Sequence, residues 1–333
     1  MSWYLKAAEN GNDSAIVNIG WFYDQGLGVP VNYGLAFKWY LIAANNGHNV
    51  GQKNIGCIYQ DGRGVPINHR LALEWFLKAA DNGNTTAQNN IGYIYGHGLG
   101  VPINHTLAAK WYREAANNGN DSAQYNIGCM YRDGHGVTKD YQMAMKWFIR
   151  SAENGNPSAQ NHIGWLYRHG HGVPIDYKVA MEWFQKAADN GSHMAQNNIG
   201  LFHHLGYGVP VDYKLALEWY HRSAHNGSII VYKNLGLLYE HGNGVIKNLT
   251  YALECYQRAA ENGYNKAQYR LGHFYENQEL YKDTSLAIKW YKKAANQGHN
   301  KAKEALRRLV QENSTGKRVH IALLCILKLT CLL

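Results

Sequence analysis

Histidine is the residue type in this chain that most directly suggests chemistry, because the sequence contains 17 of them. Two groups are close in sequence: His169 and His171 flank one glycine, and His203 and His204 are adjacent. Imidazoles bind zinc and other transition metals, but such sites also use thiol or carboxylate ligands at a suitable spacing. These groups lack such partners, and the chain contains no His-Glu-x-x-His motif. We therefore predict no metal site.

Motifs for nucleotides and for covalent catalysis are also incomplete. The segment Ser314-Thr-Gly-Lys317 lacks the leading glycine of a phosphate-binding loop, and the Gly-x-Gly-Val-Pro turns lack the third glycine of a dinucleotide-binding motif. The five cysteines include no Cys-x-x-Cys pair. No set of nucleophile, base and orienting acid can be assembled from the sequence. We therefore predict no cofactor and no enzymatic activity.

The feature that organises the sequence is a period of 36 residues, which is typical of solenoid proteins. Tryptophan recurs at this spacing, at positions 3, 39, 75, 111, 147, 183 and 219. Cys255 takes the next tryptophan position, and Trp290 comes one residue early. Glycine follows the same register, at positions 11, 47, 83, 119, 155, 191, 227 and 263. The repeat thus explains why the chain is rich in both residue types.

Each repeat contains two segments whose apolar residues follow a helical period. One, such as 123–131, has a glycine in its interior and is called the Gly helix; the other, such as 177–188, carries the recurring tryptophan and is called the Trp helix. A glycine inside a helix costs about 1 kcal/mol relative to alanine. Its return at Gly20 and equivalent positions therefore predicts a close helix crossing, which we place opposite small residues such as Ala36.

The turns between these helices carry residues that end one helix and begin the next. Asn-Gly pairs such as Asn82-Gly83 follow the Trp helix and suit a left-handed C-terminal cap. The longer Gly-x-Gly-Val-Pro turn ends on Asn or Asp, as at Asp176, and these side chains are favoured N-caps. Both connections are therefore interpreted as structural.

The unit Ala-Gln-x-Asn-Ile-Gly-x-x-Tyr-x-x-Gly-x-Gly-Val-Pro-x-Asp-Tyr-x-x-Ala-x-x-Trp-Tyr-x-Lys-Ala-Ala-x-x-Gly resembles the Sel1-like repeat, a relative of the tetratricopeptide repeat. The resemblance extends from Met1 to about Gln311. It implies an all-α, right-handed α-solenoid (superhelix) of about eight to nine helix-turn-helix repeats. Its concave groove would be lined by the first helix of each unit and would bind proteins.

The resemblance also implies an adaptor or scaffold in signalling or protein quality control. An alternative is that the array regulates a longer enzyme, such as a protein kinase, because the sequence begins inside a Trp helix. The N-terminus has no apolar run of signal-peptide length, so we expect a cytoplasmic protein. The expected partner is a protein or a peptide whose identity the sequence does not specify.

We divide the chain into a repeat array at 1–312, whose last segment, 299–312, is a capping helix, and a tail at 313–333. The apolar part of the tail has fifteen residues and contains Lys328, whereas a membrane span needs about 20 residues. Three interpretations stay open: a cover over the end of the array, a weak membrane anchor, and a non-native end of the sequence. Membrane association is not expected otherwise.

The net charge of +9 is concentrated near the C-terminus. Residues from Lys282 onward include 11 basic and 3 acidic side chains, whereas the preceding residues include 22 and 21. A nucleic-acid interface usually places basic residues in a stripe or patch along the fold. We therefore expect no nucleic-acid partner.

Binding residues are expected where the repeats differ but face one surface. Positions equivalent to Lys53, Cys57 and Gln60 turn away from the core stripe of the Gly helix, and we call them the groove column. Aromatic, arginine and amide side chains are frequent there. The candidate binding residues are Trp21, Lys53, Asn89, Tyr93, Tyr125, Arg132, Asn161, Trp165, Arg168, Asn197, Lys233 and Tyr269.

Two features of this surface have a structural alternative. Trp21 and Trp165 are the tryptophans outside the Trp-helix position, and they either anchor a ligand or pack between repeats. Asparagines beside the column, such as Asn54, Asn90 and Asn126, either bind the backbone of an extended peptide or satisfy turn groups of the adjacent repeat.

Overall fold

The computed structural model describes residues 1–311, which contain α-helices and one 3-10 helix and no β-strand. The Gly helices are α2 (Asp13–Gln25), α4 (Asn49–Asp61), α6 (Thr85–His97), α8 (Asp121–Asp133), α10 (Pro157–His169), α12 (His193–Leu205), α14 (Tyr232–His241) and α16 (Asn265–Asn277). The Trp helices are α1 (Ser2–Glu9), α3 (Tyr33–Asn45), α5 (His69–Asp81), α7 (His105–Asn117), α9 (Tyr141–Glu153), α11 (Tyr177–Asp189), α13 (Tyr213–His225), α15 (Leu249–Glu261) and α17 (Thr284–Asn296).

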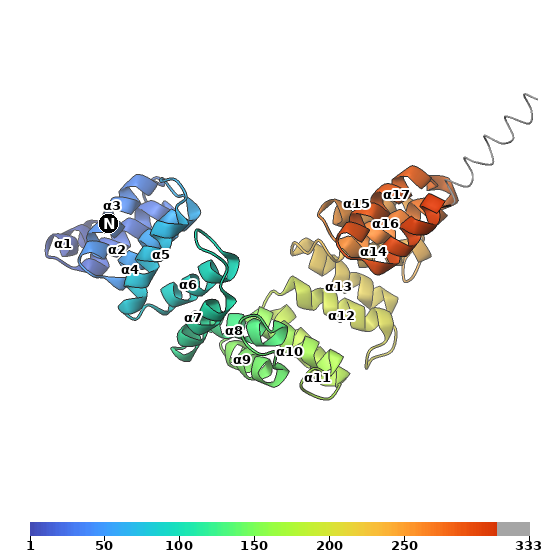
Figure 1. The fold of residues 1–333 in the computed structure, drawn as a ribbon, viewed down its shortest axis with the longest axis horizontal. Coiled ribbons are helices and arrows are strands. Elements are labelled where there is room, and N and C mark those ends of the chain that lie inside the picture. Colours follow the sequence, from blue (N-terminus) through green and yellow to red (C-terminus); the bar gives the residue numbers. More distant parts are fainter. Residues whose placement is uncertain (312–333) are drawn as a thin grey trace, which may run out of the picture. The chain divides into compact units, whose positions relative to one another are not determined.

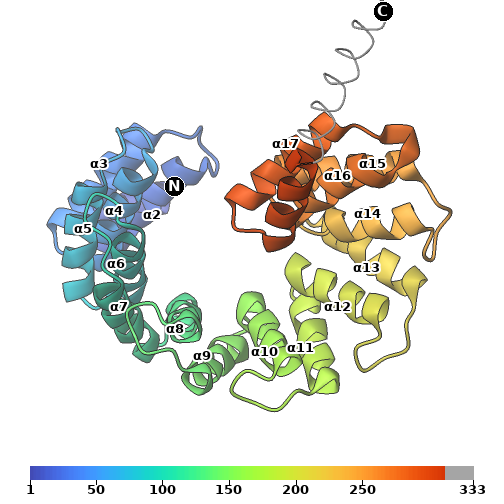
Figure 2. The same ribbon diagram turned by 45° about the vertical axis from the view of Figure 1, so that its right-hand side comes forward.

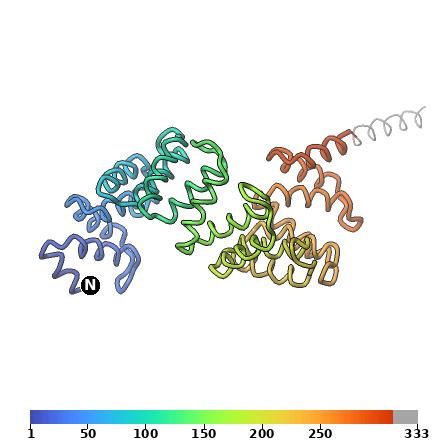
Figure 3. The backbone as a smooth tube through the Cα atoms, turned by 90° about the horizontal axis from the view of Figure 1, so that it is seen from below, coloured from blue at the N-terminus to red at the C-terminus, as the bar shows by residue number. Residues whose placement is uncertain are grey.

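These helices form two compact units, which divide between Trp183 and Phe184. Within each unit, a Gly helix packs against the Trp helix that follows it, and the pair packs against the next pair (Figures 1 and 3). In the first unit, the Gly helices lie along the inner side of the arc and the Trp helices along its outer side (Figure 2). The predicted all-α solenoid of helix pairs is confirmed.

The helices begin and end at the residues that the turn sequences indicate. Asn32 caps α3 by accepting a hydrogen bond from the backbone N–H of Leu35 at 2.9 Å. Gly26 ends α2 with φ +71°, and Gly47 follows α3 with φ +86°. Residues other than glycine rarely adopt this left-handed backbone conformation, which explains why glycine recurs after both kinds of helix.

The glycine inside seven of the Gly helices contacts the face of a buried aromatic ring. A Cβ at Gly56 would lie 2.5 Å from the ring of Phe76, and a Cβ at Gly20 would lie 2.7 Å from Tyr40. The same contact recurs for Gly92, Gly128, Gly200, Gly236 and Gly272. The expectation of a close approach was therefore right, but its partner is the aromatic residue after the tryptophan position. A residue equivalent to the predicted Ala36 also lies near the glycine in one repeat, where the carbonyl oxygen of Ala216 is 3.2 Å from the Cβ position of Gly200.

The recurring tryptophan is less buried than the next aromatic residue, which fills the core. Phe76 is completely buried, and Trp75 is half-buried with the ammonium group of Lys78 4.2 Å from its ring. Arg150 covers Trp147 in the same way, at 4.8 Å. Each basic residue lies three positions after its tryptophan, so both belong to one helix face and form a cation–π contact.

A buried glutamine near the start of most Gly helices joins neighbouring Trp helices. The Nε2 group of Gln52 donates to the carbonyl oxygen of Ala44 in α3 at 3.3 Å, and its Oε1 accepts from Asn82, after α5, at 3.0 Å. Gln124 joins Ala116 to Asn154 by the same two bonds. One side chain thus connects three consecutive helices. The sequence analysis missed this link, although the recurring Ala-Gln pair was its signal.

The last repeats depart from the pattern where the sequence departs from it. The final long turn lacks both glycines and contains the 3-10 helix η1 (Glu279–Tyr281). Residues 300–311 are helical and bury Ala302 and Leu309. The predicted tail, 313–333, lies outside the described residues. Among residues 1–311, no helix has the length and apolar character needed to cross a lipid bilayer.

The glycine–aromatic contact generates a stability prediction. We expect Gly56→Ala to lower the free energy of unfolding by about 1–3 kcal/mol, because the buried Phe76 ring cannot move away from the added methyl group. Gly96→Ala is the matched control, since its Cβ would lie 3.7 Å from Ala108. This substitution should raise the free energy of unfolding by about 0.5–1 kcal/mol. Urea denaturation followed by circular dichroism measures both; equal effects would contradict the contact.

Candidate binding surface

The candidate binding residues lie on the Gly helices, nine of them in the first unit and three in the second. Trp21 and Tyr93 are exposed, with 46% and 41% of their surface accessible. Asn161 and Asn197 are buried. The rest are half-buried: Lys53, Tyr125, Arg132, Trp165, Arg168, Asn89, Lys233 and Tyr269. Adjacent repeats therefore cover much of the groove column, which repeat periodicity alone does not reveal.

Trp21 and Trp165 occupy the same repeat position but have different surroundings. Trp21 contacts Phe22 edge-on and leaves nearly half of its surface open. Trp165 packs against His169 at 4.6 Å and His171 at 4.9 Å between ring centroids, and His171 stacks on Tyr141 at 4.5 Å. Trp165 thus belongs to a cluster of four rings around its own long turn, and Trp21 is the more exposed of the two tryptophans.

The asparagines beside the groove column form hydrogen bonds between adjacent repeats. Asn126 donates to the side-chain oxygen of Asn89 at 2.9 Å in the first unit. Asn234 donates to Asn197 at the same distance in the second unit. These bonds support the structural alternative for the amides, with a side chain rather than a turn carbonyl as the acceptor.

A further pattern joins the last position of the groove column to the core. In three repeats, the hydroxyl group of the buried Trp-helix tyrosine bonds to a side chain at that position. The pairs are Tyr220 with His204 at 3.2 Å, Tyr256 with Glu240 at 2.6 Å and Tyr291 with Glu276 at 2.7 Å. Burial is the main cause that raises the pKa of Tyr256 and Tyr291, so both hydroxyls keep their protons.

Whether the core aromatic residue is tyrosine or phenylalanine correlates with the residue about sixteen positions before it. Where the ring is phenylalanine, at 76, 148 and 184, the groove column carries Gln60, Arg132 and Arg168 instead of an acid. Tyr40 has the Asp24 carboxylate beside it, and Asp24 forms an ion pair with Arg63 at 2.7 Å. Sequence analysis missed this correlation, although alignment of the repeats contains it.

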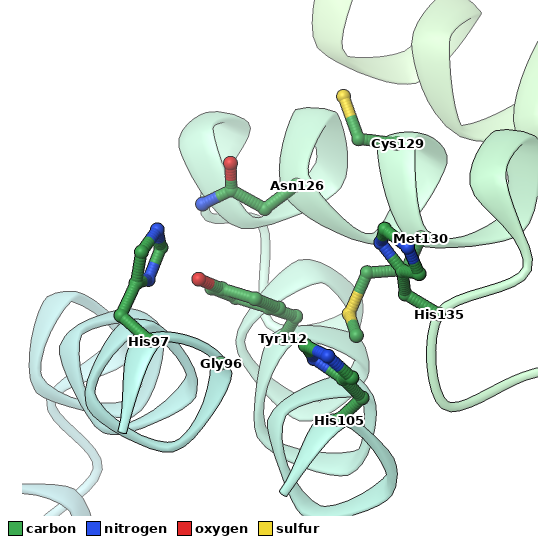
Figure 4. A pocket seen from close by; sticks show the side chains of 8 residues that line it. All are labelled: Gly96, His97, His105, Tyr112, Asn126, Cys129, Met130 and His135. Carbon is green, nitrogen blue, oxygen red and sulfur yellow. The ribbon is translucent and has the colours of Figure 1, made fainter. Parts of the chain in front are cut away.

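Tyr112 is the exception, because the position that should hold its partner is Gly96. A pocket of about 320 Å³ lies there and is lined by Gly96, His97, His105, Tyr112, Asn126, Cys129, Met130 and His135. The Tyr112 hydroxyl points toward the space between His97 and Asn126 (Figure 4). Exposed Tyr93 packs against His97 with the two rings tilted and their centroids 4.0 Å apart, so it lies next to a residue that lines the pocket. An open cavity with polar groups among its lining residues thus adjoins an exposed aromatic residue.

The second unit contains a basic pocket of about 330 Å³ between α12, α14 and α16. Lys233, Arg270, His204 and His241 line it together with Leu201, Leu205 and Leu237, and no carboxylate does. Burial, with Arg270 and Lys266 nearby, lowers the pKa of Lys233 to about 8. The ammonium group of Lys233 is therefore only partly solvated in the folded chain.

The described residues contain no group of three or more histidine, cysteine, aspartate or glutamate side chains that could hold a metal ion. His162, at an asparagine position of the repeat, has its pKa lowered to about 4 by burial, and its Nδ1 lies 2.8 Å from the carbonyl oxygen of Ser158. It is therefore a neutral, packed side chain at physiological pH.

The repeat geometry agrees with a family comparison. The model of the Sel1 repeat matches residues 1–12, 13–48, 50–84, 85–120, 121–156, 157–192, 193–228, 232–264 and 265–299. The chain belongs to the Sel1 repeat family. It is therefore a tetratricopeptide-like helical repeat protein, as the sequence analysis predicted. No curated protein matched the chain significantly.

Two solved Sel1 repeat structures are similar over most of the chain. One is c5321, a protective antigen of uropathogenic Escherichia coli with this fold; it is 34% identical, with a TM-score of 0.71, over 92% of this chain and 66% of that one. A Sel1 repeat protein from Oxalobacter formigenes is 36% identical, with a TM-score of 0.64, over 75% of this chain and 98% of that one. This chain thus spans about two thirds of the E. coli protein.

The basic pocket around Lys233 generates a prediction with a defined pH dependence. We expect Lys233→Met to raise the free energy of unfolding at pH 7 by about 1–3 kcal/mol, because folding holds this ammonium group where its pKa falls below the unfolded value. Between about pH 8 and 10.5, the unfolded chain keeps a proton on Lys233 that the folded chain has lost. The wild type therefore gains stability as pH rises, and its free energy of unfolding approaches that of Lys233→Met.

The exposed Lys214→Met is the matched control, and its effect should stay below about 0.5 kcal/mol at each pH. Urea denaturation at several pH values measures both variants. If the difference in the free energy of unfolding between wild type and Lys233→Met widens as pH rises, the burial of this amine is contradicted.

Proposed function

We propose that the chain is a non-catalytic interaction scaffold whose Gly-helix face in the first unit binds a peptide or a protein surface. The observation that carries the proposal is the placement of exposed Trp21 and Tyr93 on this face, with the Tyr112 pocket beside Tyr93. Exposed aromatic rings supply much of the binding energy in protein interfaces. Membership of the Sel1 repeat family supports the same role.

The scaffold needs no cofactor and is proposed to act as an adaptor in signalling or protein quality control in the cytoplasm. The charge distribution favours a protein over a nucleic acid. Regulation of a longer enzyme is compatible with the same binding face.

A capture experiment with the full chain tests the proposal. Wild-type protein and the Trp21→Ala, Tyr93→Ala double variant are immobilised and exposed to lysate of the source cells, and captured proteins are quantified by mass spectrometry. We expect at least one protein to be captured by the wild type and to fall about tenfold or more on the variant, because truncating aromatic anchors commonly costs over 1 kcal/mol each.

The control variant is Ile42→Ala, Ile149→Ala, which removes two exposed apolar side chains from the Trp helices α3 and α9. It should capture the same protein as the wild type, and all three proteins should have equal helicity by circular dichroism. Loss of capture with this control alone would assign binding to the outer face and contradict the proposal.

A further inference from the structure

The repeats provide an internal standard for what surrounds a buried tyrosine hydroxyl. Glu240 accepts from Tyr256 and Glu276 accepts from Tyr291, and in both cases the acceptor lies one helix away on the groove column. Tyr112 occupies the same repeat position, sixteen residues after Gly96. Its hydroxyl has no hydrogen-bond partner among the described residues. The α6–α7 repeat therefore has the hydroxyl donor of Tyr112 but no acceptor side chain at position 96.

The space for that acceptor is open. A Cβ added at Gly96 would meet only the Cβ of Ala108 within 4 Å, at an ordinary contact distance of 3.7 Å. The glycine is thus not required by packing, in contrast to Gly92 one turn earlier, whose Cβ would lie 2.7 Å from the Tyr112 ring. The missing side chain leaves the pocket shown in Figure 4.

The residues around this space favour an acceptor with a single negative charge. His97, His105 and His135 line the pocket with Asn126, and neither an acid nor a lysine or arginine is among its lining residues. Phenol groups and imidazoles with a free N–H donate hydrogen bonds to carboxylates, whereas a phosphate dianion is usually held by arginine or lysine. The Nδ1 of His97 already donates to the carbonyl oxygen of Tyr93 at 2.9 Å, so the donors available to a ligand are the Tyr112 hydroxyl and the imidazoles of His105 and His135. The pKa of the Tyr112 hydroxyl is raised mainly by burial, so this group remains a donor.

We propose that the Tyr112 pocket binds a carboxylate group of the protein partner, in the place that Glu240 and Glu276 carboxylates occupy in their own repeats. The inference rests on the proposed function, because it assigns one contact of the binding face. A partner carboxylate would accept from Tyr112 while an adjoining apolar residue of the partner packs on exposed Tyr93. The partner is thus expected to present an acidic residue next to an apolar one.

Methionine methyl NMR tests the pocket directly, because Met130 lines it and the chain contains only 6 methionines. Full-length protein labelled at the methionine methyl carbons is titrated with a five-residue peptide that has one glutamate between alanines and both ends blocked. The comparison peptides replace glutamate by glutamine, once with blocked ends and once with a free C-terminal carboxylate. We expect the Met130 signal to shift with the glutamate peptide, with a Kd of about 1–10 mM.

Three variants separate the pocket from its surroundings. Gly96→Glu supplies an internal carboxylate and should abolish the titration, whereas Gly96→Ala adds a methyl group without an acceptor and should retain it. Tyr112→Phe, a residue that other repeats carry here, should weaken binding about five- to tenfold. The other methionine signals should stay unchanged in all variants and report that the fold is intact.

The outcomes are distinct. A shift with the glutamine peptide bearing a free C-terminus, and none with the glutamate peptide, would support carboxylate binding by the pocket. It would assign the bound carboxylate to the C-terminus of the partner chain. Equal shifts with the fully blocked glutamine peptide, or an unchanged titration in Gly96→Glu, would overturn the proposal. So would no shift with any peptide; aromatic-dependent capture in the lysate experiment would then still support the binding face, so the two proposals fail separately.

Discussion

The contact between a helical glycine and the face of a buried aromatic ring sets the packing distance within the helix pairs that contain it. At Gly56, the missing side chain lets the ring of Phe76 lie against the backbone of α4, and no other residue type leaves that space. The ring in turn fills the core between two helices. Because this contact recurs in seven repeats, it gives these helix pairs the same close packing of ring against backbone.

Once the core is fixed by these contacts, the neighbouring positions on the groove column are free to vary. The last position of the groove column shows this freedom: it holds an acid at Glu240, an imidazole at His204 and no side chain at Gly96. Each choice changes what the underlying tyrosine hydroxyl meets. Variation at one repeat position therefore converts a closed, internally bonded surface into an open pocket without altering the helices.

Much of the fold could be predicted from the sequence, because its signals are local. Periodicity gave the two helices of each repeat, and Asn32 and Gly26 marked their boundaries through capping preferences that operate within a few residues. The partner of the helical glycine could not be derived this way. Ala36 and Tyr40 lie on one helix face, and only the distance between the helices decides which of them meets Gly20. The binding surface was less predictable still, since the burial of Asn161 and Asn197 depends on the repeat beside them.

The glutamine links between neighbouring Trp helices have a consequence for how the array loses structure. Gln52 and Gln124 each bond only to the helices directly before and after their own, so removal of an end repeat leaves interior links intact. A repeat with a neighbour on one side is held by fewer such links than a repeat with neighbours on both sides, so opening costs the least free energy where the array ends. Amide hydrogen exchange should therefore follow a gradient along the array, and the α6–α8 region, which holds the Tyr112 pocket and has repeats on both sides, lies well inside the protected part.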